Sequence, residues 1–135
     1  MHEWNRSIQD IVAEIDKNIK SQNDAALTLY NLAATLGYSE YYLSRQFSKI
    51  AGMPLRDYMR YRKLAFALKD IRDTDDGILN IAVKYGFSSH EAFTRAFKEA
   101  YGKTPSEYRD NPTPVVLRTL IKPFDCYLLG IDNMK

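Results

Sequence analysis

The chain has 135 residues, 45% of them hydrophobic, with a formal net charge of +2 and one cysteine. This length and composition fit one globular domain or two very small ones, and they exclude a disordered or fibrous protein. Cys126 cannot form an internal disulfide, and the only histidines are His2 and His90, so we predict no metal site and no cofactor. No run of about eighteen apolar residues occurs, which predicts a cytoplasmic protein without a membrane segment.

The first part of the chain has helical periodicity. A predicted amphipathic helix over about residues 4–20 carries isoleucine and valine at three- and four-residue spacing. Thr28 can cap a second helix, and Gly37 can end it in the left-handed conformation that glycine adopts readily. Ser39 can cap a third helix, which ends at Gly52. We expect the apolar faces of these helices to pack together.

The second half continues in the same way. A longer helix covers about residues 54–72 and has a proline at its start. After the polar turn DTDDG the helical pattern returns, with Gly86 ending one helix and Ser88 or Ser89 capping the next. Residues 104–107 have the pattern of a capping box with proline at the first helical position, which predicts a short seventh helix. The predicted fold class is therefore all-α.

Two segments about fifty residues apart share one pattern, GYSEYYLSRQF at 37–47 and GFSSHEAFTRAF at 86–97, with one extra residue in the second turn. Each indicates a helix, a tight glycine turn and a second helix, over about residues 28–52 and 78–102. This is the geometry of helix-turn-helix DNA readers. A solenoid is a weaker interpretation, because solenoids need about three repeats to close a core. We therefore predict a tandem helix-turn-helix DNA-binding domain over residues 1–111.

The second helix of each unit has an outward face of short polar or planar side chains, with one arginine at the matching position. With Leu43, Phe47, Phe93 and Phe97 buried, helical spacing places these side chains on the opposite face. Such groups suit the major groove, where base edges offer donors and acceptors. The base-facing candidates are Tyr41, Ser44, Arg45, His90, Glu91, Thr94 and Arg95.

Basic residues gather in the middle of the chain. Residues 40–72 hold eight basic and three acidic side chains, a net charge of +5, whereas residues 1–27 have a net charge of −2. Taken alone, such a basic run is a solvated face without a partner about as often as it is a binding surface. Together with the repeat it predicts phosphate contacts, to which backbone N–H groups at helix starts can add. The phosphate candidates are Ser39, Lys49, Arg62, Ser88 and Lys98.

The strings GYSEYYLSRQFSKIAGMPLRDYMRYRKL and IAVKYGFSSHEAFTRAFKEAYGKTPSEYR together resemble the DNA-binding domain of AraC/XylS-family transcription regulators, most closely the MarA/SoxS/Rob type. The resemblance covers roughly residues 8–109. It implies seven helices, two helix-turn-helix units joined by a long helix, and binding to asymmetric promoter sites on double-stranded DNA as a monomer or in tandem. It also implies recruitment of RNA polymerase. We predict that the protein itself is associated with the nucleoid. Glu91 departs from the more cationic or amide-rich forms of the second recognition helix. An acid at this position repels phosphate unless it accepts a hydrogen bond from a cytosine amino group.

Two other classes of function are compared with DNA binding, namely an enzyme and an interaction module. No Gly-rich phosphate loop, serine-nucleophile elbow or paired carboxylates occur, so we predict that the protein is not an enzyme and has no catalytic residues. The alternative is an interaction module or anti-activator that keeps the fold and binds another regulator or polymerase without specific DNA binding. The modest net charge and Glu91 leave room for that alternative.

The tail, residues 112–135, changes character. After the prolines of RDNPTP, the string VVLRTLIKPFDCYLLGI is rich in β-branched and aromatic residues around a turn-forming KPFD. This predicts an extended, β-hairpin-like tail, either the start of a truncated ligand-sensing domain or a segment that pairs two copies of the chain. We therefore expect a monomer on DNA or a weak dimer through the tail.

Overall fold

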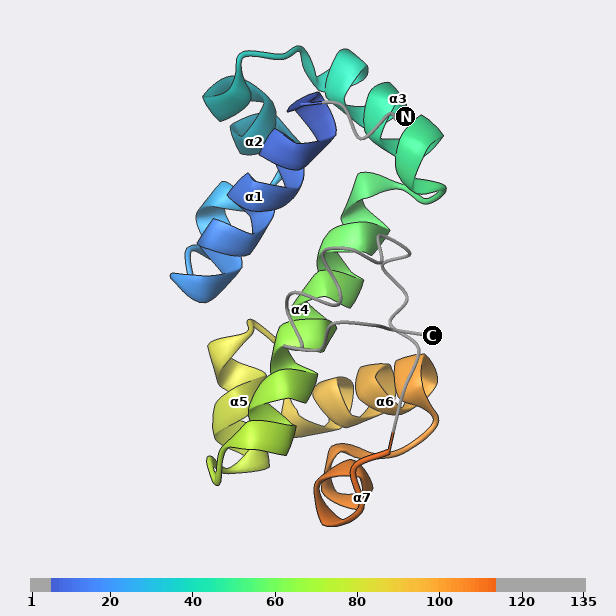
Figure 1. Cartoon of the computed structure of the whole chain (residues 1–135). Helices are drawn as coiled ribbons and strands as arrows, with labels where there is room; N and C mark the ends of the chain where they lie inside the picture. The colour runs from blue at the N-terminus through green and yellow to red at the C-terminus, as the bar shows by residue number, and fades with distance from the viewer. Residues whose placement is uncertain (1–5, 114–135) are drawn as a thin grey trace. The chain divides into compact units, whose positions relative to one another are not determined.

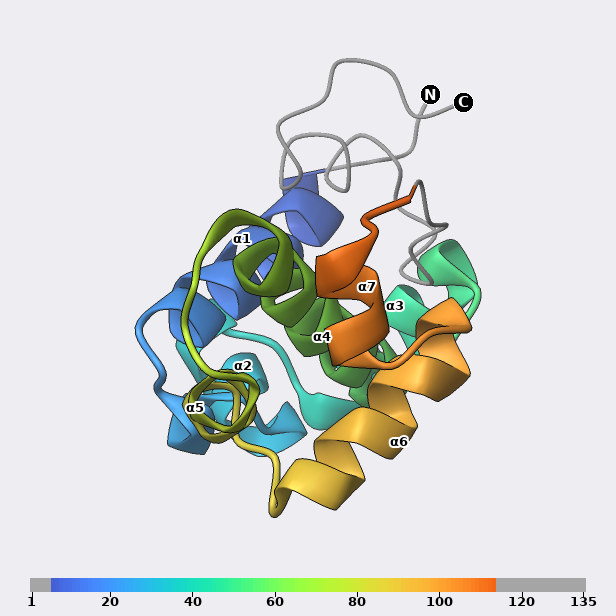
Figure 2. The same cartoon turned by 90° about the horizontal axis from the view of Figure 1, so that it is seen from below.

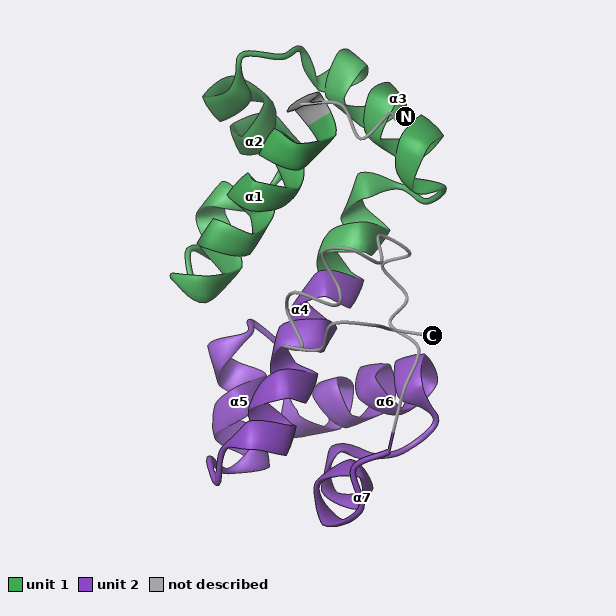
Figure 3. Ribbon diagram, viewed as in Figure 1, with its two compact units in different colours: residues 1–60 green, residues 61–135 purple. Residues whose placement is uncertain are grey.

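A computed structural model describes residues 6–113 of the chain, and every regular element within them is helical (Figure 1). Seven α-helices and one short 3₁₀ helix occur there, which confirms the predicted all-α class. No helix in this range is both long enough and apolar enough to cross a membrane. The chain forms two compact units, residues 1–60 and residues 61–135 (Figure 3).

The first unit contains α1 (Arg6–Lys20), α2 (Leu29–Leu36), α3 (Glu40–Ala51) and a 3₁₀ turn at Asp24–Ala26. Contacts join α1 to α2 and α2 to α3. The isoleucines and the valine that predicted the first helix are all buried on α1, because their spacing places them on one stripe. That spacing predicted the element correctly, although its proposed start at residue 4 lies outside the described residues.

The long helix α4 (Leu55–Asp73) begins in the first unit and ends in the second. The second unit also contains α5 (Ile78–Lys84), α6 (His90–Tyr101) and α7 (Pro105–Asp110). Contacts join α5 to α6 and α6 to α7, and α7 lies beside α6 in both views (Figures 1 and 2). The predicted capping box is present at the start of α7, where Thr104 and Glu107 each bond the other's backbone N–H.

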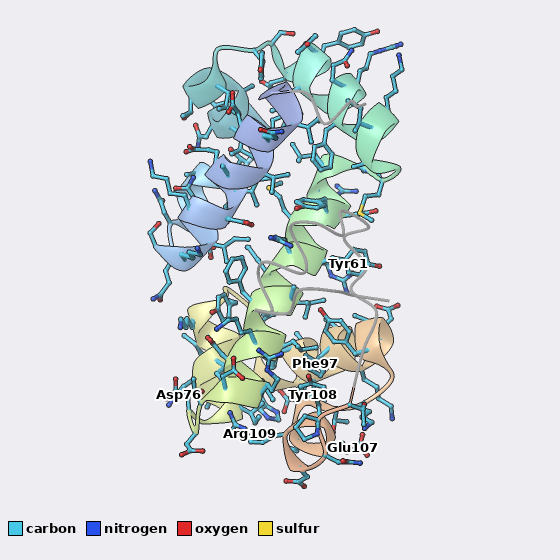
Figure 4. All side chains as sticks on the ribbon, viewed as in Figure 1. Tyr61, Asp76, Phe97, Glu107, Tyr108 and Arg109 are labelled. Atoms are coloured by element: carbon cyan, nitrogen blue, oxygen red, sulfur yellow. The ribbon has the colours of Figure 1, made fainter. Side chains whose placement is uncertain are left out.

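Phe97 is the centre of the aromatic core in the second unit. Its ring centroid lies 5.7 Å from that of Phe93, 4.9 Å from that of Tyr101 and 6.1 Å from that of Tyr108. Figure 4 shows Phe97 and Tyr108 directed toward one another from α6 and α7. In the first unit Phe47 packs edge-on against Tyr58, with 5.0 Å between centroids. Phe47, Tyr58, Phe93, Phe97 and Tyr108 are buried, as the sequence predicted, whereas Tyr101 is half-buried.

Polar contacts tie the helices of the second unit to the end of α4. The Asp70 carboxylate accepts hydrogen bonds from Lys84 Nζ at 3.0 Å and from the Tyr85 hydroxyl at 2.6 Å. Burial, and then the bond to Asp70, raise the pKa of Tyr85 above its usual range. Arg109 Nε donates to the Ile71 carbonyl at 3.0 Å, which satisfies one of the free carbonyls at the C-terminus of α4. These bonds hold α5 and α7 in place within the unit.

One predicted phosphate contact is wrong. Arg62 is only 1% exposed, and its guanidinium carbon lies 5.8 Å from the centroid of the Phe66 ring. The reason is periodicity: Arg62 follows Tyr58 and Met59 by four and three positions on α4, and both of those residues are buried, so it shares their stripe. A side chain in that place cannot reach a DNA backbone.

The predicted β-hairpin-like tail lies outside the described residues beyond Thr113.

Candidate nucleic-acid interface

The same tight turn occurs in both units. At the end of α2 the Ala33 carbonyl accepts from the Tyr38 N–H at 2.9 Å, and at the end of α5 the Ala82 carbonyl accepts from the Phe87 N–H at 3.0 Å. The chain passes through glycine at φ 79° in the first turn and φ 82° in the second. Residues other than glycine rarely adopt a backbone conformation with positive φ, which is why both turns carry glycine.

Serine begins each of the two helices that follow these turns. Ser39 Oγ accepts from the Tyr42 N–H and Ser89 Oγ accepts from the Ala92 N–H, both at 3.0 Å. The open choice between Ser88 and Ser89 therefore resolves to Ser89, because the extra residue of the second turn delays the cap by one position. Ser88 is exposed and lies one residue before the cap.

The helices α3 and α6 are matched in length as well as in their ends. Each has 12 residues and ends at a left-handed glycine, Gly52 or Gly102. Position by position, Arg45 of α3 corresponds to Arg95 of α6, and Tyr41 corresponds to Glu91. The two helices are thus built on one plan and differ in the side chains they expose.

The exposed face of α3 includes a tyrosine and an arginine in direct contact. Tyr41 is 69% exposed, and Arg45 Nη1 donates to its hydroxyl at 2.8 Å. The guanidinium carbon lies 5.3 Å from the centroid of the Tyr41 ring, so the arginine also lies against the aromatic surface. Lys49 is exposed in the last turn of the helix, and Ser44 is half-buried.

The exposed face of α6 is less basic. His90, Glu91, Arg95 and Lys98 are exposed, and Glu91 is in the first turn, where an acid complements the helix dipole. Thr94 is half-buried, and its hydroxyl oxygen is buried with no hydrogen-bond partner among the described residues. The part of Thr94 that is accessible therefore does not include its hydroxyl oxygen.

Sequence reasoning missed two features of these surfaces. The bond between Tyr41 and Arg45 has a sequence signal, since residues four apart on a helix are neighbours. Leu79 and Val83, four positions apart on α5, are 55% and 65% exposed, and sequence reasoning had not singled them out. No group of three or more metal-binding side chains occurs within residues 6–113.

Residues 32–111 match a family described as a helix-turn-helix domain. This match spans both glycine turns and both serine-capped helices. The chain belongs to the AraC/XylS family of transcription regulators. Its resemblance to the MarA/SoxS/Rob type is confirmed by the relatives described next.

Two curated relatives are the Tn10 TetD protein and SoxS, both of Escherichia coli. The chain is 40% identical to TetD over 104 residues, which cover 77% of this chain and 72% of TetD. It is 38% identical to the regulatory protein SoxS of strain K12 over 102 residues, covering 76% of this chain and 92% of SoxS. As an AraC-type protein, the chain is a DNA-binding transcription regulator.

A solved structure has a similar fold. The C-terminal domain of the two-component response regulator yesN of Fusobacterium nucleatum superimposes with a TM-score of 0.66 at 28% identity. The match covers 78% of this chain and 99% of that domain. The fold is therefore also found as a separate domain of a larger regulator.

Proposed function

We propose that the protein binds an asymmetric promoter site in double-stranded DNA by inserting α3 and α6 into major grooves, and that it acts in part by contacting RNA polymerase. The observation that carries the proposal is the repeated exposed face: two helices with the same cap, length and glycine stop, each with an arginine at the same position. A major groove admits one helix, so two such helices indicate two groove contacts.

The base-facing residues divide by chemistry. Arg45 and Arg95 match the O6 and N7 acceptors of guanine, and Ser44 and His90 offer shorter polar contacts. Glu91 can accept from the amino group of cytosine. Thr94, whose hydroxyl is buried, is suited to an apolar contact with the methyl group of thymine.

Phosphate contacts supply affinity independent of sequence. Exposed Lys49 and Lys98 lie toward the ends of α3 and α6, and Ser39 and Ser89 place backbone N–H groups at their starts. Ser89 replaces Ser88 as the phosphate candidate at the start of α6, because Ser89 is the residue that caps this helix. We propose a cytoplasmic, nucleoid-associated protein that binds its site as a monomer or as a weak dimer through residues 112–135.

The decisive experiment is a binding titration of the intact chain. Duplexes selected from a randomised pool by the protein are compared with random duplexes at two salt concentrations. Tighter binding to the selected duplexes, with affinity that falls steeply as salt rises, supports the proposal because each phosphate contact releases counterions. Equal, weak binding to all duplexes would favour the alternative, an interaction module that binds a protein instead.

A further inference from the structure

Arg45 lies on the exposed face of α3, yet its guanidinium is held in place. One of its nitrogens, Nη1, donates to the Tyr41 hydroxyl at 2.8 Å, and its carbon lies 5.3 Å from the centroid of that ring. The ring belongs to the residue four positions earlier, one helical turn away, so the contact needs no other element. Long arginine side chains on exposed faces are otherwise free to sample many rotamers.

The choice of nitrogen leaves one edge of the guanidinium complete. Nη1 is on the side of the group that faces away from the Nε–H, so the bond to Tyr41 leaves the Nε and Nη2 donors side by side. The same edge makes a two-point contact elsewhere in this protein. Arg72 donates through Nε at 2.6 Å and Nη2 at 2.9 Å to the two carboxylate oxygens of Asp73.

We infer that Tyr41 is a positioning residue for Arg45: its hydroxyl and ring hold the guanidinium so that the Nε–Nη2 edge meets the O6 and N7 acceptors of one guanine. This inference rests on the proposed DNA-binding function and deepens it. It gives Tyr41 a different role from the direct base reader that its exposed place on α3 first indicated.

The second unit provides the contrast. The position that corresponds to Tyr41 is Glu91, four positions before Arg95, and a carboxylate at that spacing can pair with the guanidinium in place of a base. A neutral phenol does not neutralise the arginine, whereas a carboxylate does. Of the two matched arginines, Arg45 is therefore the one prepared for discrimination between bases, because less of its freedom is lost on binding.

The test uses the full chain and four variants, namely Tyr41→Phe, Arg45→Ala, the double variant and Tyr42→Phe as a matched control. Tyr42 is the next residue on α3, is 42% exposed, and has its ring 5.1 Å from that of Tyr38 instead of against an arginine. Affinities are measured for the best duplex selected from a randomised pool, for that duplex with each base pair changed in turn, and for random duplexes. Thermal melting confirms that each variant is folded.

We expect Arg45→Ala to weaken binding to the best duplex about ten- to a hundredfold and to abolish the preference for guanine at one position. Tyr41→Phe should weaken it about three- to tenfold, reduce the preference at that same position and leave random duplexes unaffected. In the Arg45→Ala background it should have less than about a twofold effect, because the group it positions is gone. Tyr42→Phe should behave as the parent chain does.

Other outcomes contradict the inference in distinct ways. Additive effects of Tyr41→Phe and Arg45→Ala, or a change of preference at a different base pair, would show that Tyr41 reads a base itself. An Arg45→Ala chain that keeps its full base preference would show that Arg45 contacts only phosphate. If the parent chain selects no sequence at all, the proposed function fails and this inference fails with it.

Discussion

The two helix-turn-helix units share a scaffold and differ in their exposed chemistry. In both, an alanine carbonyl closes the turn, a glycine with positive φ reverses the chain and a serine caps a helix of 12 residues. Yet α3 exposes a tyrosine bonded to its arginine where α6 exposes a glutamate.

The residues that form the shared scaffold and the residues exposed on the surface are therefore under separate constraints. Caps, turn glycines and buried rings are determined by the backbone that both units must form, and both units therefore keep them. Outward side chains on α3 and α6 have no such constraint, so they can differ between the two units. The predictions below either break the shared scaffold or sharpen the difference between the surfaces.

The largest expected effect breaks the scaffold. Phe97→Ala should lower the free energy of unfolding by about 3–5 kcal/mol, because it leaves a cavity among the rings of Phe93, Tyr101 and Tyr108. The matched change Phe47→Ala in the first unit should fall in the same range. Urea denaturation followed by circular dichroism measures both. A loss below about 1 kcal/mol for either would show that its unit does not depend on this packing.

The next effect compares the two arginines on DNA. Arg45→Ala should reduce specific binding by about 1–3 kcal/mol. Arg95→Ala should reduce it less, because the acid Glu91 is four positions from Arg95 on the exposed face of α6. Fluorescence anisotropy with selected and random duplexes measures both variants.

Lys49→Ala is the control for the arginine comparison. It should weaken all duplexes alike and reduce the salt slope by about one. A larger loss for Arg95→Ala than for Arg45→Ala would reverse the assigned order of the two units.

A smaller effect concerns the second unit, where Asp70 of α4 accepts hydrogen bonds from Lys84 and Tyr85 at the end of α5. Tyr85→Phe removes the hydroxyl bond to Asp70 and should cost about 1 kcal/mol at neutral pH. The raised pKa of Tyr85 means that the folded chain keeps this proton while the unfolded phenol loses it above about pH 10. Stability from Tyr85 is thus fully present below about pH 10 and is lost as pH rises beyond it.

Urea unfolding measured between pH 8 and 11 tests whether the free energy of unfolding falls as pH rises. The pH range follows from the phenol pKa of about 10. The variant should lose part of the alkaline slope, up to about 1.4 kcal/mol per pH unit, and Tyr108, whose pKa burial also raises, keeps its own share. Tyr30→Phe, at a residue 67% exposed on α2, is the matched control for the loss of a hydroxyl. An identical slope in Tyr85→Phe and the parent chain would contradict the assignment.

The smallest effect sharpens the difference between the surfaces. Glu91→Gln should strengthen binding to all duplexes roughly two- to fivefold, since it removes one negative charge from the exposed face of α6. It should also cost the fold about 0.3–1 kcal/mol, because Glu91 is in the first turn of α6. Anisotropy and thermal melting on one preparation measure both. Unchanged overall affinity with a lost preference for cytosine at one position would show instead that Glu91 reads a base.

Much of the fold was determined by the sequence alone, because its signals are local. A serine or threonine cap, a left-handed glycine and a capping box each involve residues within a few positions, and those at Thr28, Ser39, Gly37 and Thr104 formed as predicted. The period of buried residues on α1, α3 and α6 likewise needs no knowledge of distant partners. The repeat of the two units, and the face on which the arginines lie, follow from the same local rules.

Only the tertiary structure decided the rest, because it depends on contacts across long separations. The bond from Lys84 to Asp70 joins residues 14 positions apart, and that from Arg109 to Ile71 joins residues 38 positions apart. Arg62 was assigned to the surface by its charge, whereas in the structure it is 1% exposed and shares the buried stripe of α4 with Tyr58 and Met59. The direction of the Thr94 hydroxyl was equally hidden, since one residue type presents either a hydroxyl or a methyl group according to the rotamer its neighbours allow.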